Sequence, residues 1–228
     1  VYGKCKWHYF VIAVVMQFGL TFSLSELNTL FLEFLQSFGY TAPVSPLPPL
    51  NGWYLLPAIL IIAVLPAIFE ETLFRGILVG RMSAAGWGTW ATVLLSGALF
   101  ALYHGNPAQT VYQFFCGACF ALLVVRAGGI LPAMTAHFLN NAVILILTSL
   151  GYGMEGGMTI PTGWNIALIV SSAVLLAGSL VYLLFLDKSN TQRGGIKNAK
   201  TFFFAAAVGI AVCAVQWIAV LVSGFLGG

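Results

Sequence analysis

Three short segments of the sequence place acids, bases and an amide inside otherwise apolar runs. The segments are ILIIAVLPAIFEETLFRGILVG, SGALFALYHGN and LPAMTAHFLNNAVILIL. A charged residue at bilayer depth costs about 2.5–3.5 kcal/mol on insertion scales, so it usually has a partner and a function. We therefore expect the polar residues of these segments to converge on one site, with the members Glu70, Glu71, Arg75, His104, His137 and Asn141.

The two adjacent glutamates are expected to play different parts. Glu71 and Arg75 are four residues apart and share a helix face, so they predict an ion pair. Glu70 is turned about 100° from Glu71 around a helix and shares that arginine less well. An interior ion pair can simply hold helices together, but a second buried carboxylate is a candidate general base.

This set of side chains could hydrolyse an amide. A glutamate and a histidine can activate a water and later protonate the leaving amine, and Glu70 is the candidate base. A histidine and an asparagine on one helix face, His137 and Asn141, can donate hydrogen bonds to an oxyanion. No serine or cysteine lies next to an obvious base, so a covalent route is not favoured.

A metal-dependent route uses some of the same residues. Glu70, His104 and His137 could instead bind a divalent ion such as zinc, with a water in the open position. The spacing is not that of HExxH, in which two histidines share one helix face. We expect water activation without a required metal, and keep the zinc route as the alternative.

Composition identifies the solvent of this chain as lipid. Of 228 residues, 60% are hydrophobic and only 7% are charged, whereas a soluble domain has about a quarter charged. A soluble enzyme, a nucleic-acid-binding protein and a disordered chain are therefore excluded. The four cysteines lie in or next to apolar runs and predict no disulfide framework. The first residue is Val1, so we expect the natural N-terminus to lie upstream.

The apolar runs predict an all-α polytopic membrane protein of about seven transmembrane helices, with eight possible, around an intramembrane polar cavity. The segment Leu27–Phe38 is amphipathic and either lies in the interface or extends the first helix. The proline-rich segment Tyr40–Gly52 is a stiff connector. The predicted spans are Trp7–Leu24, Trp53–Val79, Gly86–Tyr103, Thr110–Val125, Ile130–Leu150, Trp164–Leu186 and Phe202–Leu226.

The charges between the spans predict the orientation. With the N-terminus cytoplasmic, all Lys and Arg except Arg75 fall in inner segments, and the outer segments hold only acids. The third run then ends at His104 near the outer side, whereas Glu70 and His137 lie deeper. We therefore expect a short or tilted third helix, or a Gly105–Gln109 loop that enters the bilayer.

The three segments resemble the motifs of a known family. EETLFR at Glu70–Arg75 matches EExxxR, FALYH at Phe100–His104 matches FxxxH, and HFLNN at His137–Asn141 matches HxxxN. In this order they resemble the CPBP (Abi) intramembrane protease family and the type II CAAX prenyl endopeptidases. The resemblance implies an all-helical membrane peptidase in which Glu70 and His104 activate the water. It further implies that His137 and Asn141 form the oxyanion hole and that Glu71 and Arg75 shape and charge-balance the site.

We expect one membrane domain over residues 1–228, with its catalytic core at 53–150, in a bacterial cell membrane. The expected partners are the lipid bilayer and a membrane-presented peptide or protein, either CAAX-type, bacteriocin-like or a leader peptide; no nucleic acid is expected. A noncatalytic membrane scaffold or immunity protein of the same family is the alternative. A small transporter would also explain buried Glu and His, but neither inverted halves nor matched broken helices are evident in the sequence.

Overall fold

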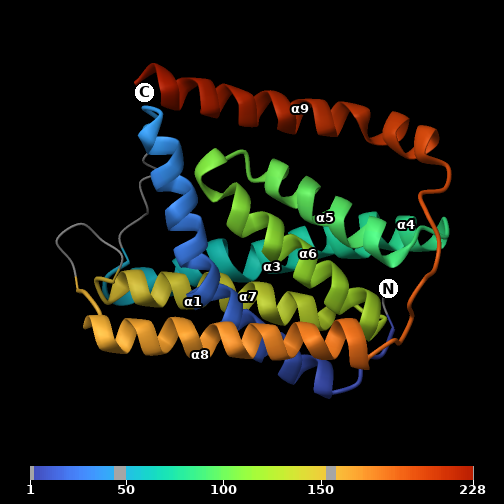
Figure 1. The fold of residues 1–228 in the computed structure, drawn as a ribbon, viewed down its shortest axis with the longest axis horizontal. Coiled ribbons are helices and arrows are strands. Elements are labelled where there is room, and N and C mark those ends of the chain that lie inside the picture. Colours follow the sequence, from blue (N-terminus) through green and yellow to red (C-terminus); the bar gives the residue numbers. More distant parts are fainter. Residues whose placement is uncertain (1–2, 44–49, 153–157, 228) are drawn as a thin grey trace.

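The computed structural model describes residues 3–43, 50–152 and 158–227, and it is an all-α membrane protein (Figure 1). Within these ranges, six helices are long and apolar enough to cross a bilayer, and a seventh apolar helix is shorter. Together they account for the seven predicted runs. The separate helices are α1 (His8–Ser37), α5 (Thr89–Tyr103), α6 (Thr110–Ala127), α7 (Leu131–Ser149), α8 (Thr162–Val181, continued by η5, Tyr182–Leu186) and α9 (Ala199–Leu226).

The second run is a single helical span, Gly52–Ala84, whose hydrogen-bonding pattern changes along its length. It begins with η1 (Gly52–Tyr54), and two π-helical stretches alternate with three α-helical ones: α2 (Leu55–Ala58), η2 (Ile59–Val64), α3 (Leu65–Glu71), η3 (Thr72–Val79) and α4 (Gly80–Ala84). Pro66 contributes to this irregularity because it has no N–H to donate to the carbonyl of Ile62 one turn earlier. π-helical turns occur frequently at functional sites, and here the charged residues lie at the junction of α3 and η3.

The first helix settles one of the open alternatives. Helix α1 continues from His8 to Ser37 without a break, so the amphipathic segment Leu27–Phe38 extends the first span up to the cap of the helix. At 30 residues the helix is about 45 Å long. Figure 1 shows that it runs obliquely across the other helices. Most of the proline-rich connector, residues 44–49, lies outside the described residues.

Helix α5, which forms a hairpin with α6, is the short third helix that we expect from the depth of His104 relative to Glu70 and His137. Helix α5 has 15 residues, about 22 Å, which is less than the roughly 30 Å of a hydrocarbon core. The turn after it includes η4 (Pro107–Gln109), in which Pro107 and Ala108 are buried. In Figure 1 this turn lies part of the way along α8 and α9 instead of at their ends. The Trp217 indole donates to the Thr110 hydroxyl at 2.9 Å, which fixes the turn about two thirds of the way along α9.

Close packing of α5 on α6 depends on glycine. A Cβ on Gly117 would lie 2.9 Å from the Cα of Gly97 and 2.9 Å from the Cβ of Phe100. Small residues let transmembrane helices approach closely enough for backbone groups to be reached by side chains. The carbonyl of Gly117 is in fact one of the ligands of the site described below.

Basic residues gather at one end of the helices. The N-terminus, α4 and the segment between α8 and α9 lie at the same end in Figure 1. Asp187, at this end, accepts a hydrogen bond from Tyr9 at 2.7 Å and from the Ser189 N–H at 2.9 Å. Burial raises the pKa of Asp187, but these hydrogen bonds and the Arg126 charge outweigh it, so its pKa lies below the ordinary value. This contact ties the start of α1 to the end of η5.

Candidate active site

The predicted Glu71–Arg75 ion pair is present and fully buried. Arg75 Nη1 lies 2.9 Å from Glu71 Oε1, and neither side chain has any exposed surface. Arg75 Nη2 donates to the Gly117 carbonyl of α6 at 2.9 Å. Its guanidinium carbon also lies 4.4 Å from the centre of the Phe100 ring of α5. Arg75 therefore connects three helices, which supports an architectural part for this residue.

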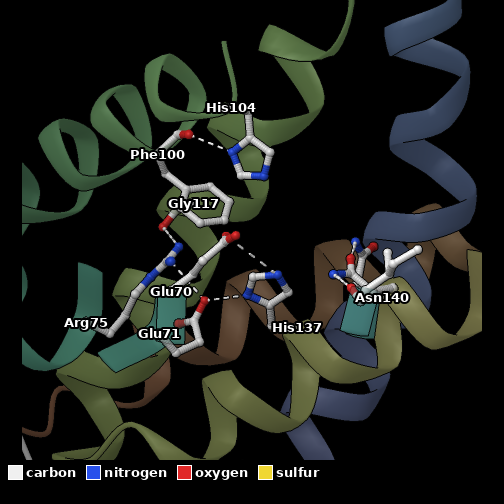
Figure 2. Close-up of polar contacts among 10 residues, drawn as sticks. Glu70, Glu71, Arg75, Phe100, His104, Gly117, His137 and Asn140 are labelled. Carbon is white, nitrogen blue, oxygen red and sulfur yellow. Dashed lines mark hydrogen bonds and ion pairs between the residues drawn. The ribbon is translucent and has the colours of Figure 1, made fainter. Parts of the chain in front are cut away.

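His137 joins this ion pair from α7. Its Nδ1 lies 2.8 Å from Glu71 Oε1, the same oxygen that accepts from Arg75. Its Nε2 lies 3.9 Å from Glu70 Oε2 (Figure 2). Because a carboxylate oxygen only accepts, Nδ1 must carry a proton, and Nε2 is the ring nitrogen that faces Glu70.

Glu70 is the less confined of the two glutamates. Its side chain retains 19% of its exposure, against none for Glu71. Its Oε2 is nevertheless buried and has no hydrogen-bond partner within the described ranges. The 3.9 Å to His137 Nε2 is too long for a direct hydrogen bond but suits two groups that share a water. The expected difference between the two carboxylates is therefore visible in their contacts.

His104 caps the end of α5 and approaches the site from the opposite side. Its Nδ1 lies 2.8 Å from the Phe100 carbonyl, and its ring packs against the Phe100 ring with 4.6 Å between centres. A carbonyl can only accept, so Nδ1 is the protonated nitrogen and Nε2 is left available. In Figure 2 the Glu70 carboxylate lies between the rings of His104 and His137. The rings of His104 and His137 thus both pack on Phe100, with 4.6 and 5.9 Å between centres, but among the described residues His104 forms no ion pair with Glu70.

The amide of Asn141 is held by the backbone of the second span. Its Nδ2 donates to the Ile62 carbonyl at 2.8 Å. This is the carbonyl to which Pro66 cannot donate, because proline has no N–H. An amide nitrogen carries two N–H groups, so this bond leaves Asn141 one more donor. Its Oδ1 accepts from Nδ2 of Asn140 at 3.0 Å.

A second, neutral polar cluster surrounds Asn140, and we define it as the amide network. Asn140 Oδ1 accepts from Gln17 Nε2 of α1 at 2.7 Å and from the hydroxyl of Tyr112 of α6. Gln17 also donates to Thr21 at 2.9 Å. The sequence does not predict a functional part for these residues. The available signal was Gln17, a glutamine within the apolar first span, and Figure 2 shows Asn140 on the other side of His137 from Glu71.

The ligand set of the zinc alternative has suitable donor types. Both imidazoles are held through Nδ1, as metal-binding histidines commonly are, and Glu70 offers an oxygen. In the part of the chain that the structure describes, however, no three such side chains form a group that could hold a metal ion.

Comparisons with known proteins address the resemblance. Residues 52–143 match the profile of a family described as "Type II CAAX prenyl endopeptidase Rce1-like". Neither the curated proteins nor the solved structures contain a significant match to the chain. The matched segment runs from the start of the second span into α7 and includes all three motifs. The resemblance read from those motifs is therefore confirmed: residues 52–143 of this membrane protein are similar to the type II CAAX prenyl endopeptidases of the Rce1-like kind.

Proposed function

We propose that this protein is an intramembrane endopeptidase that hydrolyses a peptide bond of a membrane-presented peptide or protein. The observation that carries the proposal is the Glu70 carboxylate, which keeps 19% of its exposure and whose Oε2, without a hydrogen-bond partner among the described residues, lies 3.9 Å from Nε2 of His137. A general base needs a position from which it can reach a water and a substrate. Oε2 of Glu71 also has no partner there, but the Glu71 side chain is fully buried and its Oε1 is held by both Arg75 and His137.

In the proposed mechanism, Glu70 and His104 hold the attacking water. Because Nδ1 of His104 donates to the Phe100 carbonyl, its Nε2 can accept a hydrogen bond from one O–H of the water while Glu70 accepts a hydrogen bond from the other. The water oxygen attacks the carbonyl carbon of the substrate as its proton moves to Glu70. That proton then passes to the leaving amine as the C–N bond breaks, which regenerates the carboxylate.

His137 and Asn141 are proposed to stabilise the oxyanion of the tetrahedral intermediate. Asn141 contributes the N–H that does not bind the Ile62 carbonyl. His137 donates Nδ1–H to Glu71, so it can donate from Nε2 only when the ring carries both protons. Its contribution therefore depends on its charge state. Glu71 and Arg75 hold His137 and the α6 backbone in place.

The substrate is proposed to be a CAAX-type, bacteriocin-like or leader peptide. A purified-protein assay separates this function from the noncatalytic scaffold. The protein in detergent is incubated with prenylated CAAX peptides and with leader peptides, and the products are identified by mass spectrometry. We expect cleavage by the parent and by Glu33→Gln, an exposed acid of α1, but not by Glu70→Gln. Binding of a peptide without cleavage by the parent would instead support the scaffold.

The same assay tests the proposal that no metal is required. A chelator should change the cleavage rate by less than twofold. Inhibition that zinc alone reverses would assign Glu70, His104 and His137 as ligands and would contradict water activation by Glu70 as base.

We further propose that the protein lies in a bacterial cell membrane with its N-terminus in the cytoplasm. Eight of the nine Lys and Arg residues, all but Arg75, fall in the segments assigned to that side. In a cysteine-free background, Lys197→Cys should be labelled by an impermeant reagent only after the cells are opened. Thr41→Cys, beside Gly224 near the end of α9, should be labelled in intact cells. The reverse pattern would contradict the orientation.

A further inference from the structure

A large cavity lies along part of α9, on the side that faces the rest of the protein. It has a volume of about 1110 Å³ and lies between η3 and α4 on one side, α5 beneath, and α9 on the other. Its walls are almost entirely apolar, with Leu73, Ile77, Leu99 and Ile210 among them. In Figure 1, α9 lies at the outer edge of the helices, and it packs on part of α5. No residue of its most apolar 18-residue stretch is buried, so α9 leaves room for an occupant.

One end of this cavity carries positive charge. Arg81 of α4 and Lys197, just before α9, line it, and both are exposed. Among the described residues neither forms an ion pair, since the ion pairs present involve only Glu70, Glu71, Arg75 and His137. The far end is closed by Tyr103 and Cys213. The cavity is therefore an apolar groove with two uncompensated cations at one mouth.

The length of the groove matches one leaflet of a bilayer. From Ala199, at the charged mouth, to Cys213, α9 rises about 21 Å. Half of a bilayer, headgroups included, is about 20–22 Å thick. A molecule with apolar chains of leaflet length and an anionic head at the membrane surface fits both the dimensions and the charge. Basic pockets between transmembrane helices are known to recognise such headgroups.

We infer that this groove binds an anionic phospholipid, with its acyl chains along α9 and its headgroup at Arg81 and Lys197. The site does not depend on the proposed peptidase function, because none of the candidate catalytic side chains lines it. It does lie next to that site, since Tyr103 precedes His104 and packs on Phe74, with 5.2 Å between ring centres. A bound lipid would thus occupy the space between α9 and the wall of the candidate active site.

The headgroup contact is tested by native mass spectrometry of the full-length protein in detergent. The protein is mixed with phosphatidylglycerol or phosphatidylethanolamine of matched chains. We expect preferential retention of phosphatidylglycerol, and a roughly 10- to 30-fold loss of its affinity in Arg81→Gln/Lys197→Gln, at about 1 kcal/mol per charge. Lys6→Gln/Lys188→Gln removes the same charge from the same end outside the groove and should retain the preference.

The acyl-chain contact is tested by filling the groove. Gly209 lines it, and a Cβ there would meet nothing within 4 Å, so Gly209→Leu can enter the groove without a clash at its base. Gly178 of α8 is equally open but lies outside the groove, so Gly178→Leu is the matched control. We expect phosphatidylglycerol to be lost only from Gly209→Leu.

Three outcomes would overturn the inference. The first is equal retention of both lipids by the parent, and the second is unchanged retention in either groove variant. The third is a peptide, instead of a phospholipid, that copurifies with the parent and is lost in Gly209→Leu. Because the readout is lipid binding, a parent that binds phosphatidylglycerol but cleaves no peptide would refute only the proposed function.

Discussion

Helix α7 carries two buried polar clusters that differ in kind. Through His137 it joins an ionisable cluster with Glu70, Glu71 and Arg75 of the second span. Through Asn140 and Asn141 it joins the neutral amide network of α1 and α6. In the described structure two carboxylate oxygens of the ionisable cluster, Oε2 of Glu70 and Oε2 of Glu71, have no partner. Both oxygens of the two α7 asparagines are engaged, and in the amide network it is Oε1 of Gln17 that has no partner.

The difference separates groups that can exchange a proton from groups that can only hold a position. A carboxylate and an imidazole change charge during a reaction, so leaving one of them incompletely bonded keeps it available. An amide has a fixed set of donors and acceptors and is useful when fully oriented. We therefore expect substitutions in the first cluster to change chemistry or folding greatly, and substitutions in the second to have graded effects.

The largest effect is expected at Glu70. Glu70→Gln keeps the size and hydrogen-bonding capacity of the side chain but cannot take a proton. Cleavage should fall by about 10²- to 10⁴-fold, while thermal stability and peptide binding stay unchanged. The measurement is the steady-state cleavage rate beside a binding isotherm. Turnover within tenfold of the parent would show that the base lies elsewhere. The ionisable cluster would then not differ from the amide network in supplying the base.

Arg75 should instead act on stability. Arg75→Ala leaves Glu71 buried without its partner at 2.9 Å and frees the Gly117 carbonyl. Loss of one partner of a buried pair typically costs about 3–5 kcal/mol, so folded yield and unfolding temperature should fall together with activity. Lys200→Ala, an exposed cation of α9, is the control and should be close to neutral. An Arg75→Ala protein as stable as the parent would assign this residue to the chemistry.

A substitution of Asn141 tests whether the amide network contributes to stabilising the tetrahedral intermediate. Asn141→Ala removes the proposed oxyanion donor and the hydrogen bond to the Ile62 carbonyl. We expect the turnover number to fall by about 10²- to 10³-fold with little change in the Michaelis constant. If the loss appeared only in the Michaelis constant, Asn141 would position substrate instead of stabilising the intermediate.

The smallest effect is expected at Gln17. Gln17→Leu removes a donor to Asn140, but the Tyr112 hydroxyl still donates to the same oxygen. The expected cost is about 1 kcal/mol of stability and a severalfold loss of turnover. Gln36→Leu, on the exposed part of the same helix, is the control. In a double-mutant cycle with Asn141→Ala the turnover losses should not add, and strict additivity would show that the network does not orient Asn141.

The sequence predicted contacts within one helix better than contacts between helices. The Glu71–Arg75 pair followed from a spacing of four residues, and the seven helices followed from apolar run length. The contact of His137 with Glu71 did not follow, because periodicity identifies a helix face but not which helix it meets. The depth of His104 was recognised as inconsistent with a full-length third span, and the 15-residue α5 explains why.

The amide network was missed for a related reason. Gln17 lies in a span without a motif, outside the matched residues 52–143. Its partner Asn140 is not itself a motif position but precedes Asn141, which is one. A single glutamine in an apolar run has no periodic signal. An unpaired polar side chain in lipid is costly in free energy, so the glutamine indicates that a partner exists. The sequence does not show where in the chain that partner lies.

The Gln17–Asn140 hydrogen bond has a consequence for biosynthesis. Helix α1 is synthesised and enters the membrane before α7. About 120 further residues must be synthesised before Asn140 is available to accept the hydrogen bond from Gln17. During that interval a polar amide faces lipid, the translocation machinery or a chaperone. A ribosome-bound chain that stops before α7 should therefore hold α1 loosely. The matched segment 52–143 does not include Gln17, so within it Asn140 would keep only the hydrogen bond from Tyr112.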